Sequence, residues 1–146
     1  LEGRALKAYG AAQRQLKQME KAKESLTRSL HTFRQQSTFD HECSALSELI
    51  QLNLELDNLS ALTIYGEDIW KLLHSGKLDY THAEPTKAWW ACYSAFQRID
   101  DPRAAVALRT VRELFLKQLA SIEDENWKDN FSNQIVEHHM LLQSLR

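Results

Sequence analysis

Apolar residues recur every three to four positions along most of this chain, which is the period of an amphipathic α-helix. Short polar breaks divide the pattern into three predicted helical hairpins and one last amphipathic helix, at residues 1–36, 40–75, 81–121 and 124–145. The composition, with only four glycines and two prolines, favours long helices joined by short loops. The sequence therefore predicts one all-α domain of about seven helices.

The second hairpin contains the most completely apolar segment. Within residues 40–56, apolar side chains lie around most of the helical circumference, at Ala45, Leu46, Leu49, Ile50, Leu52 and Leu56. This distribution predicts a helix that is buried on two sides. Gly76 follows the next helix, at 59–74, and we expect it to adopt a left-handed conformation just past the helix end.

The third hairpin carries two helix-start signals. Thr81 and Glu84 have the spacing of a capping box, in which each side chain satisfies a free backbone donor. Asp101 is expected to cap the second helix of this hairpin. Pro102 fits its first turn, because proline lacks only an N–H that has no partner there.

The charge and the cysteine content limit the expected binding partners and the expected cellular compartment. The formal net charge is −2 and the pI is near 6.3, so the chain has no bulk attraction to nucleic acid or to an anionic membrane. Cys43 and Cys92 form no C-x-x-C pair and suit a reducing, cytoplasmic compartment. No apolar stretch approaches the roughly 20 residues that a membrane span needs. Because the chain starts within a helical pattern and without Met, we expect a fragment of a longer protein.

Equivalent positions recur in the three hairpins. In the first, Tyr9 and Gly10 form a large–small pair, and the small residue lets two helices approach closely; the other recurring positions there are Leu6, Ala22, Leu26 and Ser29. Alanines at 22, 61 and 105 are equivalent, so the predicted repeats are 39 and 44 residues long. These positions resemble the tetratricopeptide repeat, although Arg109 stands where the repeat has a large apolar residue. The resemblance implies a right-handed α-solenoid, in which the last helix caps the stack.

The last third of the chain carries a second resemblance. Its residues are Trp89, Trp90, the run Asp101-Pro102-Arg103-Ala104-Ala105, and Phe131, Ile135, His138, Leu141 and Leu142. Residues 86–145 resemble the end of the tetratricopeptide region in large bacterial signalling proteins of the STAND NTPase type, which include transcriptional regulators. Val136 and His139 depart from that pattern, because Pro and Arg are frequent there. The resemblance implies that NTPase and output domains lie upstream, outside this chain.

Metal-binding and catalytic patterns are missing from the sequence. The histidines and cysteines have neither the i, i+4 nor the C-x-x-C spacing of two ligands that face one ion. Glu123, Asp124 and Glu125 cluster where a helix start is predicted, so they complement the helix dipole. The sequence has no Gly-rich phosphate loop and no nucleophile elbow. We therefore expect no enzyme activity, no metal and no cofactor.

The first helix of each hairpin is expected to line a concave groove. The repeat register places nine residues on it: Arg4, Lys7, Arg14, Gln15, Asn53, Lys87, Trp90, Gln97 and Arg98. This set is positive and amide-rich, which suits an acidic or C-terminal carboxylate group of an extended peptide. Two alternatives remain for this face. Its charged residues could simply be solvated, or the face could pack against further repeats upstream of this chain.

Aromatic residues with helical spacing are predicted to lie in the core rather than at the groove. They are Tyr9, Phe33, Tyr65, Trp89, Phe96, Phe115 and Phe131. Only Trp90 is expected to face a bound segment.

The function predicted from these features is a protein-interaction or ligand-sensing module of a larger bacterial regulator. Its expected partner is a protein or peptide, and the candidates include other domains of the same parent chain. We expect no membrane association. The alternative is a helical-repeat nucleic-acid-binding module, which requires a continuous basic stripe.

Overall fold

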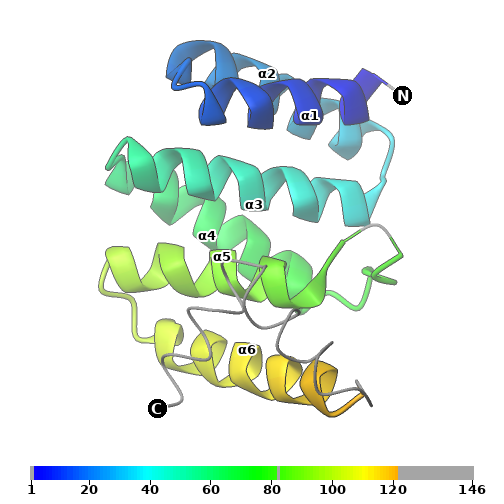
Figure 1. Cartoon of the computed structure of the whole chain (residues 1–146), viewed down its shortest axis with the longest axis vertical. Coiled ribbons are helices and arrows are strands. Elements are labelled where there is room, and N and C mark those ends of the chain that lie inside the picture. The colour runs from blue at the N-terminus through cyan, green and yellow to red at the C-terminus, as the bar shows by residue number, and fades with distance from the viewer. Residues whose placement is uncertain (1, 82, 122–146) are drawn as a thin grey trace.

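The computed structural model describes residues 2–81 and 83–121, and these ranges hold six α-helices and no β-strand (Figure 1). The helices are α1 (Glu2–Gln15), α2 (Met19–Gln35), α3 (Phe39–Glu55), α4 (Leu59–Leu73), α5 (Pro85–Arg98) and α6 (Arg103–Ala120). The prediction of an all-α chain is confirmed for this part. The predicted helix at 124–145 lies outside the described residues.

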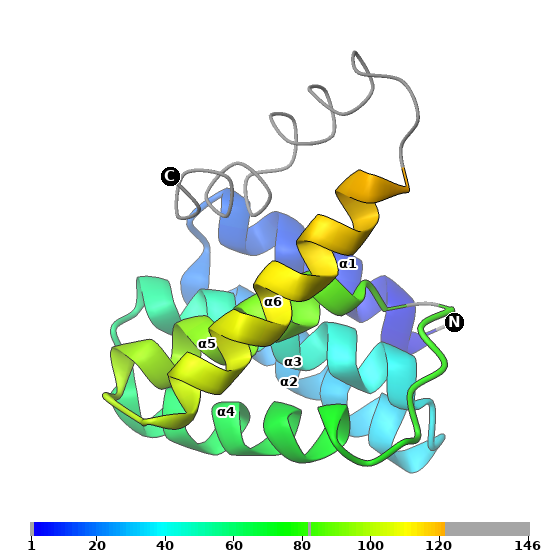
Figure 2. The ribbon, with the colours of Figure 1, turned by 90° about the horizontal axis from the view of Figure 1, so that it is seen from below.

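Successive helices run in opposite directions and form two layers (Figure 1). Helices α1, α3 and α5 lie side by side in one layer, and α2 and α4 pack behind them. Helix α6 packs on α5 and lies obliquely to α4 (Figure 2). Since α3 contacts α1, α2, α4 and α5, it is the central element of the stack.

Helix α3 is buried on two sides, as its sequence predicts. Leu46, Leu49, Ile50 and Leu52 have no exposed surface, although they lie around most of its circumference. Burial of a leucine or isoleucine side chain stabilises the folded state by about 1.5–3 kcal/mol. The hydrophobic core therefore centres on this helix and continues into its neighbours.

Four helix ends share one turn geometry that the sequence did not reveal. In each, one residue adopts a left-handed conformation with φ between 53° and 62°: Lys17, Ser37, Asp57 and Asp100. The next N–H then donates to a carbonyl five residues earlier, as from Gln18 to Gln13 at 2.8 Å. This bond defines the Schellman motif, where glycine is the usual residue. The turns at Lys17, Asp57 and Asp100 are 40 and 43 residues apart, close to the predicted 39 and 44.

The predicted capping box at Thr81 and Glu84 is wrong. Helix α5 begins at Pro85, and the preceding Glu84 is extended, with φ −85° and ψ 118° and no side-chain cap. The proline ring disfavours a helical conformation in the residue before it, so the helix does not extend back to Thr81. At the start of α6, Asp101 does cap the helix, because its Oδ1 accepts a hydrogen bond from the backbone N–H of Arg103 at 2.9 Å.

Tyr9 is not a core residue, in contrast to its predicted place. It is 62% exposed, and Leu16, just past the end of α1, is 70% exposed. Helix α1 packs on α2 and α3, and no helix of the described residues covers its outer face. Helical spacing identifies an apolar face, but it does not show whether another element covers that face.

The repeat register also changes in the third hairpin. Ala22 is fully buried, whereas the supposedly equivalent Ala105 is exposed. The buried residues of α6 are Ala107, Val111 and Phe115. The packed face of α6 therefore lies two residues further along than the predicted register, and Arg109 is exposed.

The close helix approach predicted at Gly10 is confirmed. A Cβ atom at this position would lie 2.7 Å from Cγ of the fully buried Leu26 and 3.3 Å from the carbonyl oxygen of Ala22. We expect Gly10→Val to lower the free energy of unfolding by about 2 kcal/mol, because overpacking outweighs the gain in helix propensity. Urea unfolding followed by circular dichroism measures this change.

The matched control is Ala12→Val, which places the same side chain at an exposed position of the same helix. It should cost no more than about 0.7 kcal/mol, the propensity difference between the two residues. Equal stability of the Gly10 variant and the wild type would contradict the close approach.

Arg103 joins α6 to α4 and α5. Its guanidinium group contacts Asp101 at 2.8 Å and Glu67 at 2.7 Å. It also lies 4.4 Å from the ring centroid of Phe96 and 5.5 Å from that of Trp70, in cation–π geometry. The hydrogen bonds from Arg103 lower the pKa of both carboxyl groups and raise the pKa of the guanidinium.

These lowered pKa values predict an acid-dependent stability. A carboxyl group with a depressed pKa stabilises the fold above its unfolded pKa, here 4.5 for Glu67 and 3.8 for Asp101, and loses this as the pH falls through the folded pKa. We expect Arg103→Met to lower stability by about 1 kcal/mol at neutral pH, with a smaller difference near pH 3. Urea unfolding at both pH values measures it.

Lys71→Met is the control for this prediction. Lys71 also approaches Glu67, at 4.0 Å, but its side chain is 72% exposed. It should change stability by less than about 0.5 kcal/mol at either pH. A pH profile that is the same in the Arg103 variant and the wild type would exclude the ion pairs as its source.

Candidate functional site

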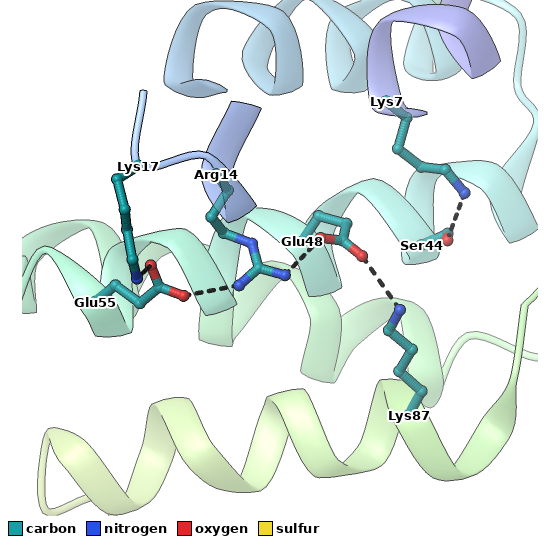
Figure 3. A network of polar contacts seen from close by, with 7 residues as sticks. All are labelled: Lys7, Arg14, Lys17, Ser44, Glu48, Glu55 and Lys87. Carbon is teal, nitrogen blue, oxygen red and sulfur yellow. Dashed lines mark hydrogen bonds and ion pairs between the residues drawn. The ribbon is translucent and has the colours of Figure 1, made fainter. Parts of the chain in front are cut away.

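The nine predicted groove residues lie on α1, α3 and α5, the three helices that form one layer of the stack. Helix α1 holds four of them, α3 holds Asn53, and α5 holds the other four. Three of the nine, Lys7, Arg14 and Lys87, meet over the exposed edge of α3. Together with four residues that were not predicted, they form a polar strip that consists of Lys7, Arg14, Lys17, Ser44, Glu48, Glu55 and Lys87 (Figure 3).

Glu48 is the centre of the polar strip. Its Oε1 contacts Lys87 Nζ at 3.1 Å, and its Oε2 contacts Arg14 Nη2 at 3.5 Å. The carboxylate side chain is only 11% exposed, whereas Lys87 is 43% exposed. Glu48 on α3 therefore links α1 to α5 through one ion pair on either side (Figure 3).

Lys7 occupies a different environment within the strip. Its ammonium group donates to the hydroxyl of Ser44 at 2.9 Å and, within the described residues, has no carboxylate within ion-pair distance. Burial lowers the pKa of Lys7, the nearby charge of Glu48 opposes this, and Lys87 and Arg4 lower the pKa further. Lys7 is thus a partly desolvated cation whose hydrogen-bond partner among the described residues is a neutral hydroxyl.

At the other end of the strip, every charged side chain takes part in an ion pair. Glu55 accepts from Arg14 at 2.7 Å and lies 3.5 Å from Lys17, whose side chain is 74% exposed. Arg14 therefore divides its guanidinium between Glu55 and Glu48. Its Nε is buried and has no hydrogen-bond partner within the described residues.

The remaining predicted residues do not join the strip. Asn53 is 2% exposed and donates to the carbonyl of Leu49 at 2.7 Å, so its amide does not reach the surface. Arg98 pairs with Asp57. Trp90 is half-buried, with its ring 5.3 Å from that of Tyr93. Arg4, Gln15 and Gln97 are exposed.

A shallow depression lies at the far end of α5. It has a volume of about 400 Å³ and is lined by Leu54, Ser94, Gln97, Arg98 and Asp100. Its charged residues carry opposite signs, and Arg98 is already paired with Asp57. The depression therefore has no excess charge that would favour an anionic or a cationic ligand.

Of the four strip residues that were not predicted, Lys17 lies in the turn after α1 and the other three, Ser44, Glu48 and Glu55, lie on α3. They follow one another at intervals of four and seven residues, which places them on one face of α3. The sequence shows this spacing, but the predicted repeat register placed Asn53, and not these three residues, on the side of α3 that faces the groove. Counting the acidic residues on each face would have revealed that carboxylates lie opposite the predicted cations.

The strip therefore carries less positive charge than the nine residues suggested. Glu48 and Glu55 oppose Arg14, Lys17 and Lys87, and Asp57 opposes Arg98. The strip holds four cations and two carboxylates, and Lys7 is the cation that forms no ion pair within the described residues, with exposed Arg4 one helical turn away. An anionic ligand would meet there a cation that no described carboxylate contacts.

The described residues offer little for other chemistry. None of their His, Cys, Asp and Glu side chains form a group of three or more arranged to hold a metal ion. Among the described helices, none has both the length and the apolar character that crossing a bilayer requires. Cys43 and Cys92 are buried free thiols, and burial raises the pKa of each to about 12.

Comparisons with protein-family models, with curated proteins and with solved structures gave no match to this chain. The resemblance to tetratricopeptide repeats therefore depends on the residues of the chain and on its stacked helical hairpins.

The raised thiol pKa values predict that both cysteines are unreactive in the folded state. Because the thiolate is the nucleophile, a pKa of about 12 leaves on the order of one thiol in ten thousand ionised at pH 8. We expect no labelling by iodoacetamide at that pH within the time that labels the unfolded chain completely. Mass spectrometry of native and urea-unfolded protein measures this, and rapid native labelling would contradict the burial of the thiols.

Proposed function

We propose that this chain is a non-enzymatic interaction module that binds a carboxylate-bearing extended peptide on the face formed by α1, α3 and α5. In this proposal the stacked hairpins are tetratricopeptide-like units of a right-handed solenoid. The module belongs to a larger bacterial regulatory protein, and its partner is a peptide segment of another protein or of the parent chain.

The environment of Lys7 is the observation that carries the proposal. Desolvation is unfavourable for an ammonium group, and the charge of Glu48 offsets only part of it, so the pKa of Lys7 is lowered. A ligand carboxylate at this point would supply an opposite charge in direct contact with Lys7. Charge-assisted hydrogen bonds of this kind contribute about 1.5–3 kcal/mol.

The charge pattern supports a peptide over nucleic acid. Binding along a phosphate backbone requires a continuous series of cations. In the polar strip, Glu48 and Glu55 interrupt that series and hold Arg14 and Lys87 in ion pairs. Binding of a single carboxylate group requires only one available cation, such as Lys7.

The proposal is tested with a defined probe, a short fluorescein-labelled peptide that ends in Asp-Asp with a free C-terminal carboxylate. The reference is the same peptide ending in Asn-Asn with an amidated C-terminus. We expect the acidic probe to bind, with an affinity that falls about tenfold in Lys7→Met, the loss equivalent to one charged hydrogen bond. Fluorescence polarisation at about 50 mM salt, where screening is moderate, measures the affinity.

Lys17→Met is the matched control, because it removes the same charge from an exposed lysine that already faces Glu55. It should change the affinity by less than about twofold, as expected for an exposed, screened charge. Equal binding of the acidic and amidated peptides, or equal losses in both variants, would exclude a carboxylate site at Lys7. A labelled single-stranded oligonucleotide in the same assay tests the nucleic-acid alternative.

A further inference from the structure

Glu48 already occupies the place that an acidic ligand would seek. Its two oxygens contact cations from the two neighbouring helices, Arg14 on α1 and Lys87 on α5. Its own side chain is largely covered, at 11% exposed. The carboxylate of Glu48 is therefore already paired with two of the cations near the proposed site at Lys7.

The charge of Glu48 also extends to Lys7. It opposes the lowering of the Lys7 pKa, although the two side chains form no ion pair. Lys87 lowers that pKa, so the three groups interact electrostatically with one another. A carboxylate that approached Lys7 would be repelled by Glu48 and would compete with it for Lys87.

We infer that Glu48 is an internal competitor for the cations of the polar strip and sets the affinity of this face for acidic partners. This inference rests on the proposed function, because it requires that the face binds a carboxylate. The partner class that follows is an extended segment with two or more adjacent carboxylates. A segment with several charges gains from Lys7 and Lys87 together, which offsets the repulsion by Glu48.

Glu55 offers a matched comparison within the same strip. It has the same chemistry, lies on the same face of α3 and also pairs with Arg14, at 2.7 Å. Its second contact is Lys17, however, and within the described residues it makes no contact with Lys7 or Lys87. Neutralising Glu55 therefore changes the charge of the strip equally but leaves the competition at Lys87 intact.

A purely structural role for Glu48 makes a different prediction. If Glu48 only ties the three hairpins together, Glu48→Gln would lower stability and leave peptide affinity unchanged. Internal competition instead requires that the variant binds more tightly while its fold is retained. Peptide affinity therefore separates the two roles, and stability alone does not.

The experiment compares wild type, Glu48→Gln and Glu55→Gln in the polarisation assay, with the acidic and amidated peptides. We expect Glu48→Gln to bind the acidic peptide about five- to tenfold more tightly, the effect of removing one like charge at a distance of several ångströms. Glu55→Gln should stay within about twofold of wild type. The amidated peptide should show no difference among the three proteins.

Each outcome has one meaning. Acidic-peptide binding that is unchanged or weakened in Glu48→Gln overturns this inference and leaves the proposed function standing, as does equal tightening in both variants. No binding by any of the three proteins overturns both. Binding by Glu48→Gln alone, with none by the wild type, overturns the proposed function and with it this inference, because the unchanged face then has no affinity for a carboxylate. Circular dichroism verifies folding, and Glu48→Met replaces Glu48→Gln if the latter does not fold.

Discussion

The burial of α3 on two sides is the constraint on which the rest of the structure depends. A helix whose leucines and isoleucines lie around most of its circumference must be covered by several neighbours. Here α1, α2, α4 and α5 cover it, and α6 is attached through α5. Turns of three or four residues then place each next helix against the one before it, except between α4 and α5, which the longer segment 74–84 connects.

The same burial determines where polar chemistry is possible on α3. Ser44, Glu48 and Glu55 lie along the side of this helix that faces α1 and α5, whereas Glu42, on another side, pairs with Arg34 of α2. Cations from α1, from the turn after it and from α5 converge on the carboxylates of that side (Figure 3). The polar strip is thus a consequence of packing as well as a candidate site, and only Lys7 lacks a carboxylate partner within it.

Four helix ends adopt the Schellman turn without the glycine that usually marks it in a sequence. Lysine, serine and aspartate occupy the left-handed position at four helix ends, a conformation that costs residues other than glycine of the order of 1 kcal/mol. The apolar contacts of the flanking helices outweigh this cost. Sequence reading placed breaks close to these sites from their polarity, but it did not show that all four adopt one geometry.

Helical periodicity and breaks between helices are local properties, so the sequence alone predicted the helices of the described residues and the burial of α3 on two sides. The sequence did not show which apolar helix faces a neighbouring helix covers, as the exposed Tyr9 illustrates. It also did not show which charged residues form ion pairs with one another. The ion pairs of the polar strip join residues 34 to 41 positions apart, such as Arg14 with Glu48 and Glu55. Such pairs depend on the rotation of each helix about its axis, which packing against neighbouring helices fixes.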